Sequence, residues 1–118
     1  MQRVTLNNSL FTIGMTIALV AGVPRVARAQ DEAAKKGQEV DAAQKCSVCH
    51  SIAGKGGKAN PLDGVGAKIS ADETRQWIVN PKEMTAKTKA ERKPPMKAYP
   101  NLPAADVDAL VAYLQTLK

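Results

Sequence analysis

Apolar residues in the C-terminal segment recur three and four positions apart, a period that puts them on one face of an α-helix. The residues that share this face are Val107, Leu110, Val111, Leu114 and Leu117. The pattern predicts a helix from about Ala104 to Leu117, with Pro103 at or near its first turn, where proline is tolerated. We expect this helix face to pack in the core.

A second helix is predicted from about Asp31 to Lys45. It begins with two acidic residues, which suit the positive end of a helix dipole, and Ala33, Gly37 and Val40 share one face. Gly37 has two interpretations. It either lets another helix approach closely, or it is only a weak point that costs about 1 kcal/mol relative to alanine.

A third, shorter helix is marked by a capping box. The Ser70 hydroxyl and the Glu73 carboxylate are spaced to satisfy free amides of a first helical turn. The helix should run to about Val79 and end before Pro81, which disfavours helical geometry in the preceding residue. Trp77 lies in this helix and either walls a cofactor pocket or belongs to the core.

The segment between Cys49 and Ser70 predicts an irregular loop because it is rich in glycine. Strand patterns are almost absent around it, so the mature chain is expected to be all-α.

The N-terminal segment predicts a signal peptide. Arg3 supplies a positive start, an apolar stretch runs from about Leu10 to Val23, and Ala27-Arg28-Ala29 has the pattern of a cleavage site. The apolar stretch is shorter than the roughly 20 residues of a membrane span. We therefore divide the chain into a signal peptide, residues 1–29, and one domain, residues 30–118, that is exported.

Removing the signal peptide takes away three arginines and no acid, so the net charge falls from +6 to +3. Such a mild charge, without a basic and aromatic face, gives no support for nucleic-acid binding. The mature domain has 89 residues and keeps only Trp77, Tyr99 and Tyr113 as large aromatics. A core this small is marginal without a further stabilising group. We expect a buried cofactor to complete it.

Cys46-Ser47-Val48-Cys49-His50 indicates what that cofactor is, because C-x-x-C-H supplies two thiols and an imidazole for covalent attachment and ligation of haem c. Cys46 and Cys49 would hold one haem, and His50 would be the proximal iron ligand. A disulfide leaves His50 unexplained, and a thioredoxin-like pair needs a βαβ unit. A zinc site lacks ligands, because the chain has no other histidine or cysteine.

Bis-histidine ligation of the iron is impossible because no second histidine exists, and Met84 and Met96 are the only thioethers of the mature chain. We prefer Met96, which follows two prolines that would hold its loop rigid, and Met84 is the alternative. Either methionine could instead fill a gap in the core. A ligating histidine usually donates its second ring N–H to an oxygen acceptor. The Pro61 carbonyl is our candidate acceptor.

Several of these segments together resemble a bacterial class I cytochrome c. The segments are Cys46 to His50, Asn60 to Gly66, Trp77 to Pro81, Met96, and Leu110 to Leu114. The resemblance implies the small cytochrome c fold, with three main helices and short helical turns wrapped around one covalently bound haem. It also implies His50 and Met96 as axial ligands, periplasmic electron transfer, and contact between Gly37 and the Tyr113 region.

These expectations describe an electron carrier and not an enzyme. The expected partners are redox proteins, and the chain would act as a monomer or as a subunit of a redox complex. Segment 82–97 carries six basic residues against two acids. It is either a solvated loop or a surface that steers an acidic partner. The alternative function is a haem c sensor or peroxidase-like protein whose sixth coordination site is labile or open.

Overall fold

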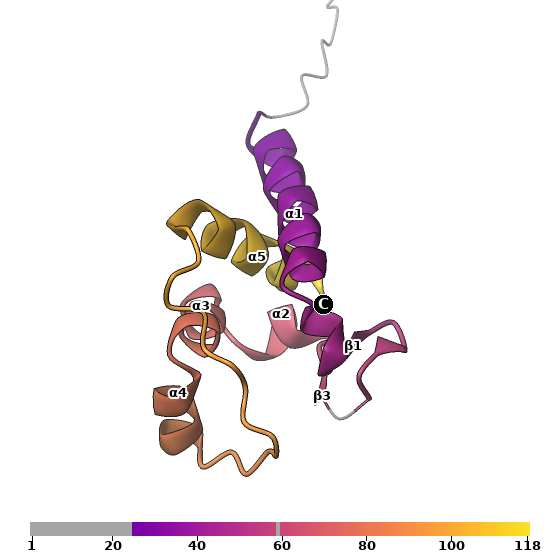
Figure 1. Cartoon of the computed structure of the whole chain (residues 1–118). Helices are drawn as coiled ribbons and strands as arrows, with labels where there is room; N and C mark the ends of the chain where they lie inside the picture. Colours follow the sequence, from indigo (N-terminus) through magenta and orange to yellow (C-terminus); the bar gives the residue numbers. More distant parts are fainter. Residues whose placement is uncertain (1–24, 59) are drawn as a thin grey trace, which may run out of the picture.

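The computed structural model describes residues 25–58 and 60–118, which form a mostly helical fold with a small three-stranded sheet (Figure 1). In chain order the elements are α1 (Arg25–Ala43), the 3₁₀ turn η1 (Cys46–Val48), β1 (His50–Ile52), β2 (Lys55–Gly56), β3 (Asn60–Pro61), α2 (Val65–Lys68), α3 (Ala71–Val79), α4 (Pro81–Thr88) and α5 (Ala104–Thr116). The expectation of an all-α chain is therefore corrected by the sheet.

The most extensive contact between two elements joins α1 and α5, which cross in Figure 1. Gly37 lies at this crossing. A Cβ atom there would overlap the Ala109 carbonyl oxygen and lie 2.5 Å from Tyr113 Cβ. Gly37 therefore allows close helix approach, and the expected contact between Gly37 and the Tyr113 region is confirmed.

The predicted apolar face of α5 forms much of the core. Val107, Leu110, Val111 and Leu114 are buried, whereas Leu117 is half-buried beside them. Val40 from α1 and Ile78 from α3 complete the buried cluster. The C-terminal helix was thus predicted correctly in extent and orientation, to within one residue at its end.

The capping box at the start of α3 is confirmed. Ser70 Oγ accepts a hydrogen bond from the Glu73 backbone N–H at 3.1 Å, and the Glu73 carboxylate accepts one from the Ser70 N–H at 3.2 Å. Helix α3 ends at Val79 as expected, but Pro81 does not introduce a loop. It is the first residue of α4, a position that suits proline because its missing N–H would have had no helical partner.

The predicted loop between Cys49 and Ser70 contains short regular elements. Strand β1 pairs with β2 in antiparallel and with β3 in parallel orientation, so β1 lies in the centre. Each strand has only two or three residues, too few to give an alternating apolar pattern. The one-turn helix α2 follows and approaches α5 closely, because a Cβ atom at Gly66 would lie 2.5 Å from the Gln115 carbonyl oxygen.

Helix α1 begins and ends earlier than predicted. It starts at Arg25 and not at Asp31, because no glycine or proline lies between Arg25 and Gly37. It ends at Ala43 because Lys45 adopts a left-handed conformation, with φ of 56°, that turns the chain into η1. Most of the predicted signal peptide, residues 1–24, lies outside the described residues. Within residues 25–58 and 60–118, no helix is long and apolar enough to cross a membrane.

Candidate haem-binding site

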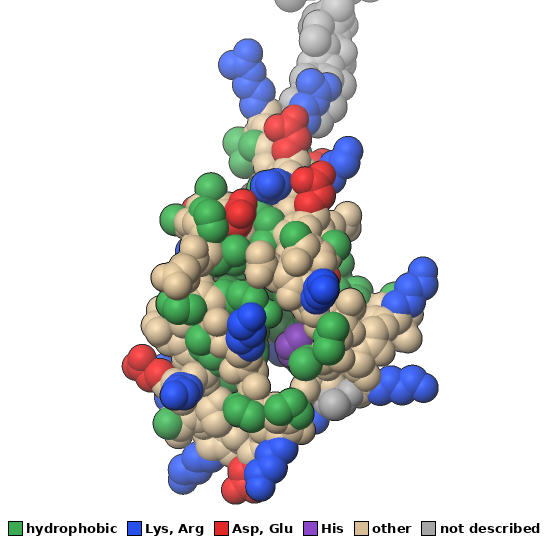
Figure 2. All heavy atoms as spheres, viewed as in Figure 1, with side chains coloured by type: hydrophobic (Ala, Val, Ile, Leu, Met, Phe, Trp, Pro, Cys, Tyr) green, Lys and Arg blue, Asp and Glu red, His purple; other side chains and the backbone are tan. Residues whose placement is uncertain are grey.

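A cavity of about 300 Å³ opens between the Cys46–His50 segment, α3, α5 and residues 90–97. Its wall is mostly apolar and includes Leu62, Val65, Ile69, Trp77, Ile78, Leu110 and Leu114. Cys46, Cys49, His50 and Met96 also line it. Figure 2 shows the hollow from outside, with the histidine (purple) visible within it. The cavity therefore joins four chemically distinctive side chains with an apolar surface.

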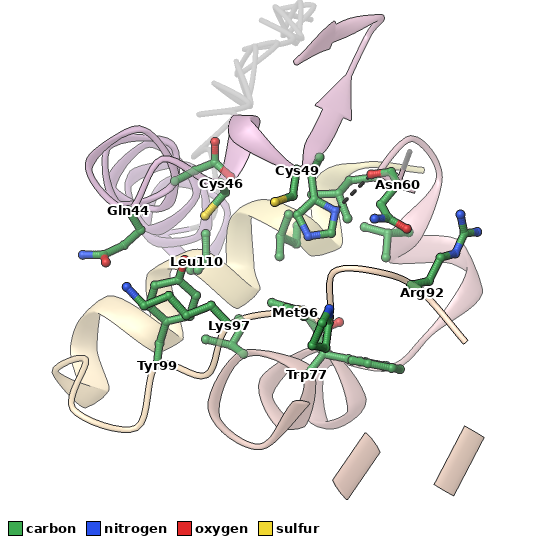
Figure 3. A pocket seen from close by; sticks show the side chains of 18 of the residues that line it. Gln44, Cys46, Cys49, Asn60, Trp77, Arg92, Met96, Lys97, Tyr99 and Leu110 are labelled. Carbon is green, nitrogen blue, oxygen red and sulfur yellow. Dashed lines mark hydrogen bonds between the residues drawn. The ribbon is translucent and has the colours of Figure 1, made fainter. Parts of the chain in front are cut away.

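The two cysteines and Met96 come from different sides of this cavity. In Figure 3, Cys46 and Cys49 lie along one side, whereas Met96 and Trp77 lie on the opposite side. Cys46 is half-buried and Cys49 is exposed, and both carry free thiols. A flat group that fills the space between these two sides would contact both thiols along one edge.

Two glycines hold the Cys46–His50 segment in place. The Gly57 N–H donates to the Ser47 carbonyl at 2.8 Å and to the His50 carbonyl at 3.1 Å. Gly56 has a φ of +111°, a left-handed conformation that favours glycine, and a Cβ atom there would overlap the His50 carbonyl oxygen. The glycine-rich hairpin therefore packs directly against the segment that carries the cysteines and the histidine.

The His50 ring is oriented by a backbone carbonyl. His50 Nδ1 donates a hydrogen bond to the Asn60 carbonyl oxygen at 3.0 Å (Figure 3, dashed line). A carbonyl oxygen only accepts, so Nδ1 carries the proton and Nε2 keeps its lone pair for a metal. The half-buried imidazole lines the cavity. His50 thus has the tautomer that a proximal iron ligand requires.

The acceptor predicted from the sequence, the Pro61 carbonyl, is wrong by one residue. Strand β3 pairs in parallel with β1 in a register that sets Asn60 opposite His50 and Pro61 opposite Ser51. The Asn60 carbonyl therefore reaches the ring. Pro61 is exposed and is not among the residues that line the cavity.

The two candidate methionines differ in position. Met96 is half-buried and lines the cavity, in the segment that joins α4 to α5. Met84 is only 4% exposed, lies within α4, and is not among the lining residues. The side chain of Met96 therefore shares the cavity with His50, whereas Met84 packs as an interior residue of the α3–α4 region.

Trp77 lines the cavity from α3 and is half-buried, so it serves both as pocket wall and as part of the packed interior. Tyr99 and Arg92 were not expected at the site from the sequence, yet both line the cavity. The Tyr99 N–H donates to the Ile78 carbonyl at 3.0 Å, which fixes the segment after Met96 against α3. Tyr99 lies three residues after Met96 in the sequence, and this proximity was the signal that could have placed it at the site.

The cysteine pair lacks the electrostatics of a redox-active C-x-x-C motif. Burial, followed by the neighbouring Asp41 carboxylate, raises the pKa of the Cys46 thiol to about 12. Catalytic thiol pairs instead depend on a lowered pKa that supplies thiolate at neutral pH. Cys46 is therefore protonated at neutral pH in this fold, and its environment does not favour thiol–disulfide exchange.

The side chains present fit a covalently held haem. Two thiols three residues apart face one cavity, an imidazole with a free Nε2 lies next to them, and a thioether shares the space. The apolar wall suits a porphyrin plane. Among the described residues, no group of three or more His, Cys, Asp or Glu side chains is arranged to hold a metal ion by itself.

Comparison with known proteins gives one match. Residues 34–118 match the family model described as Cytochrome c, so the match spans most of the chain and includes every cavity-lining residue named above. The searches of curated proteins and of solved structures found no match. The family match supports the resemblance to class I c-type cytochromes that the motifs indicated. The chain belongs to the cytochrome c family, and this membership supports haem binding and electron transport.

Proposed function

We propose that this protein is a periplasmic one-electron carrier with a single covalently attached haem c, ligated by His50 and Met96. The observation that carries the proposal is the shared cavity, which Cys46, Cys49, His50 and Met96 all line. The bound haem iron would supply the chemistry by alternating between its ferric and ferrous states. No substrate is turned over.

Each residue has a distinct task in this proposal. Cys46 and Cys49 would tether the haem through thioether bonds, and His50 would provide Nε2 while the Asn60 carbonyl fixes its ring. Met96 would provide a soft sulfur ligand, which favours the ferrous state and so a more positive potential. The apolar wall would keep water away from the iron.

Export to the periplasm is part of the same proposal, because c-type haem attachment uses thiols in an oxidising compartment. The buried residues of α1 are Gly37 and Val40, both beyond the predicted cleavage site after Ala29. Cleavage would therefore leave the contact between α1 and α5 intact. The exported protein should begin at Gln30, and N-terminal sequencing checks this.

A redox partner with an acidic surface fits the rim of the cavity. Arg92 and Lys97 line the cavity within the basic segment 82–97, and Figure 2 shows Lys and Arg side chains near the hollow. With ferricyanide as an anionic oxidant, Lys93→Glu should slow electron transfer, and the difference should shrink as salt screens the charge. The control Lys35→Glu changes the same charge on α1. Electron-transfer rates that do not change with ionic strength would contradict electrostatic steering by this segment.

The absorption spectrum of the exported protein tests the ligand set. The ferric form should show a sulfur-to-iron charge-transfer band, and the dithionite-reduced form should not shift when carbon monoxide is added, because both axial positions are filled. A rapid shift with carbon monoxide and no charge-transfer band would mean an open iron. The sensor or peroxidase-like function would then replace the electron carrier.

A further inference from the structure

Asp41 lies in the last turn of α1 and lines two cavities. It lines the candidate haem cavity together with Cys46 and His50. It also lines a second cavity of about 310 Å³, together with Ser47, His50, Ile52, Lys55 and Tyr113. Its half-buried carboxylate therefore stands beside the Cys46–His50 segment, on the side of the haem cavity where the proposed proximal ligand lies.

This is an unfavourable place for a carboxylate. The C-terminal end of a helix carries partial negative charge, and burial raises the pKa of Asp41 by disfavouring its charged form. The ion pairs Lys36–Asp106 and Arg75–Asp108 do not include Asp41. His50 lowers the pKa of Asp41, but by less than burial raises it.

The Asp41 carboxylate lies close enough to the Cys46 thiol to contribute to its raised pKa. A thioether does not ionise, so covalent attachment of the haem would remove this interaction. The carboxylate would then lie beside the attached haem.

We infer that the Asp41 carboxylate lowers the reduction potential of the haem by stabilising the ferric iron. The inference rests on the proposed function. Reduction adds one electron to the iron and changes its charge by one unit, so a nearby fixed negative charge favours the more positive, ferric state. Partial burial weakens the screening by water that a surface carboxylate would experience.

Asp41 thus lowers the reduction potential of the haem, whereas other groups around the cavity raise it. Met96 as ligand raises the potential, and the positive side chains of Arg92 and Lys97 on the cavity wall act in the same direction. Asp41 partly offsets these effects from the proximal side. Replacing it with a neutral residue should therefore make the protein a stronger oxidant without changing the iron ligands.

The test is the midpoint potential of the purified holoprotein at neutral pH, measured for Asp41→Asn and for the matched control Glu39→Gln. Glu39 is two residues away on the same helix but is exposed, so its removal changes net charge without changing the proximal side. Asp41→Asn should shift the one-electron equilibrium towards ferrous by about tenfold, or about 59 mV. Glu39→Gln should leave it nearly unchanged, and Asp41→Glu should keep the wild-type value.

A second readout separates tuning from a structural role. Asp41→Asn should keep the ferric charge-transfer band and should not lower the free energy of unfolding, since it removes a buried charge from a helix C-terminus. If Asp41→Asn does not fold, Asp41→Ser supplies the neutral variant. If Asp41→Asn keeps both the wild-type potential and an intact haem spectrum, the inference about Asp41 is overturned but the proposed function is not. The same holds if Glu39→Gln shifts the potential as much as Asp41→Asn does. A wild-type protein without covalent haem would instead overturn the proposed function.

Discussion

Met84 and Met96 both belong to the segment between Pro81 and α5, but their surroundings differ. Met84 is 4% exposed within α4, whereas Met96 is half-buried on the cavity wall. An interior methionine contributes by packing, and a cavity methionine presents its sulfur to whatever the cavity holds. Only one of the two shares the cavity with His50.

Leucine substitutions should separate these two roles, because leucine is close to methionine in volume but cannot ligate iron. Met96→Leu should abolish the ferric charge-transfer band and let the reduced protein bind carbon monoxide. Met84→Leu should keep the band and cost less than about 1.5 kcal/mol of stability. Absorption spectra of both variants check this. Loss of the band in Met84→Leu with retention in Met96→Leu would make Met84 the ligand.

The sequence predicted which residues meet at the site better than it predicted their local register. Cys46, Cys49 and His50 are fixed by a motif with a chemical reason for each position, and all three line one cavity. The acceptor for His50 was missed by one residue because it depends on how β3 pairs with β1. Pairing of two-residue strands is a tertiary effect, and no local pattern in Asn60 or Pro61 signals it.

At the level of elements, the crossing of α1 and α5 depends on the missing side chain of Gly37. Gly37→Ala should destabilise the protein although alanine is the better helix former by about 1 kcal/mol, because the added methyl overlaps Ala109 and Tyr113. We expect a net loss of about 1–3 kcal/mol, typical of overpacking. Chemical denaturation of the holoprotein measures it.

The neighbouring Gln38 supplies the control for this substitution. Gln38 is exposed on α1, so Gln38→Ala should change the free energy of unfolding by less than about 0.5 kcal/mol. Equal stability of Gly37→Ala and wild type would mean that the helices separate at no cost. The close crossing would then not contribute to the stability of the fold.

Elements with strong local signals were predicted, and those set by context were not. The α3 capping box and the α5 apolar face depend on nearby residues, and both are confirmed. Helix α4 was missed because Pro81 was taken only as a terminator of the preceding helix, whereas it also starts the next one. The early start of α1 was missed because its acids suggested an N-terminus at Asp31, although helix-forming residues precede them.

For the molecule as a whole, the cavity takes the place of a larger core. The buried cluster contains six residues, and a cavity of about 300 Å³ lies beside it. Without a group in the cavity, its mostly apolar wall would face water. The total stability of a small domain is only about 5–15 kcal/mol, so we expect the group that covers this wall to supply a large part of it.

The protein without haem should therefore be largely unfolded. A Cys46→Ala/Cys49→Ala variant, which cannot attach haem, should show weak helical circular dichroism and no cooperative thermal transition. The wild-type holoprotein should melt cooperatively under the same conditions. A cooperative, native-like melt of the haem-free variant would mean that the polypeptide core is sufficient without the cofactor.

The mass of the exported protein after denaturation is the decisive measurement of covalent haem attachment, because denaturation removes any haem that is not covalently bound. We expect the mass of residues 30–118 plus one haem, which reports attachment, haem number and cleavage in a single measurement. The Cys46→Ala/Cys49→Ala variant should give the polypeptide mass alone. A wild-type mass without haem would contradict the assignment of Cys46 and Cys49 as its attachment sites.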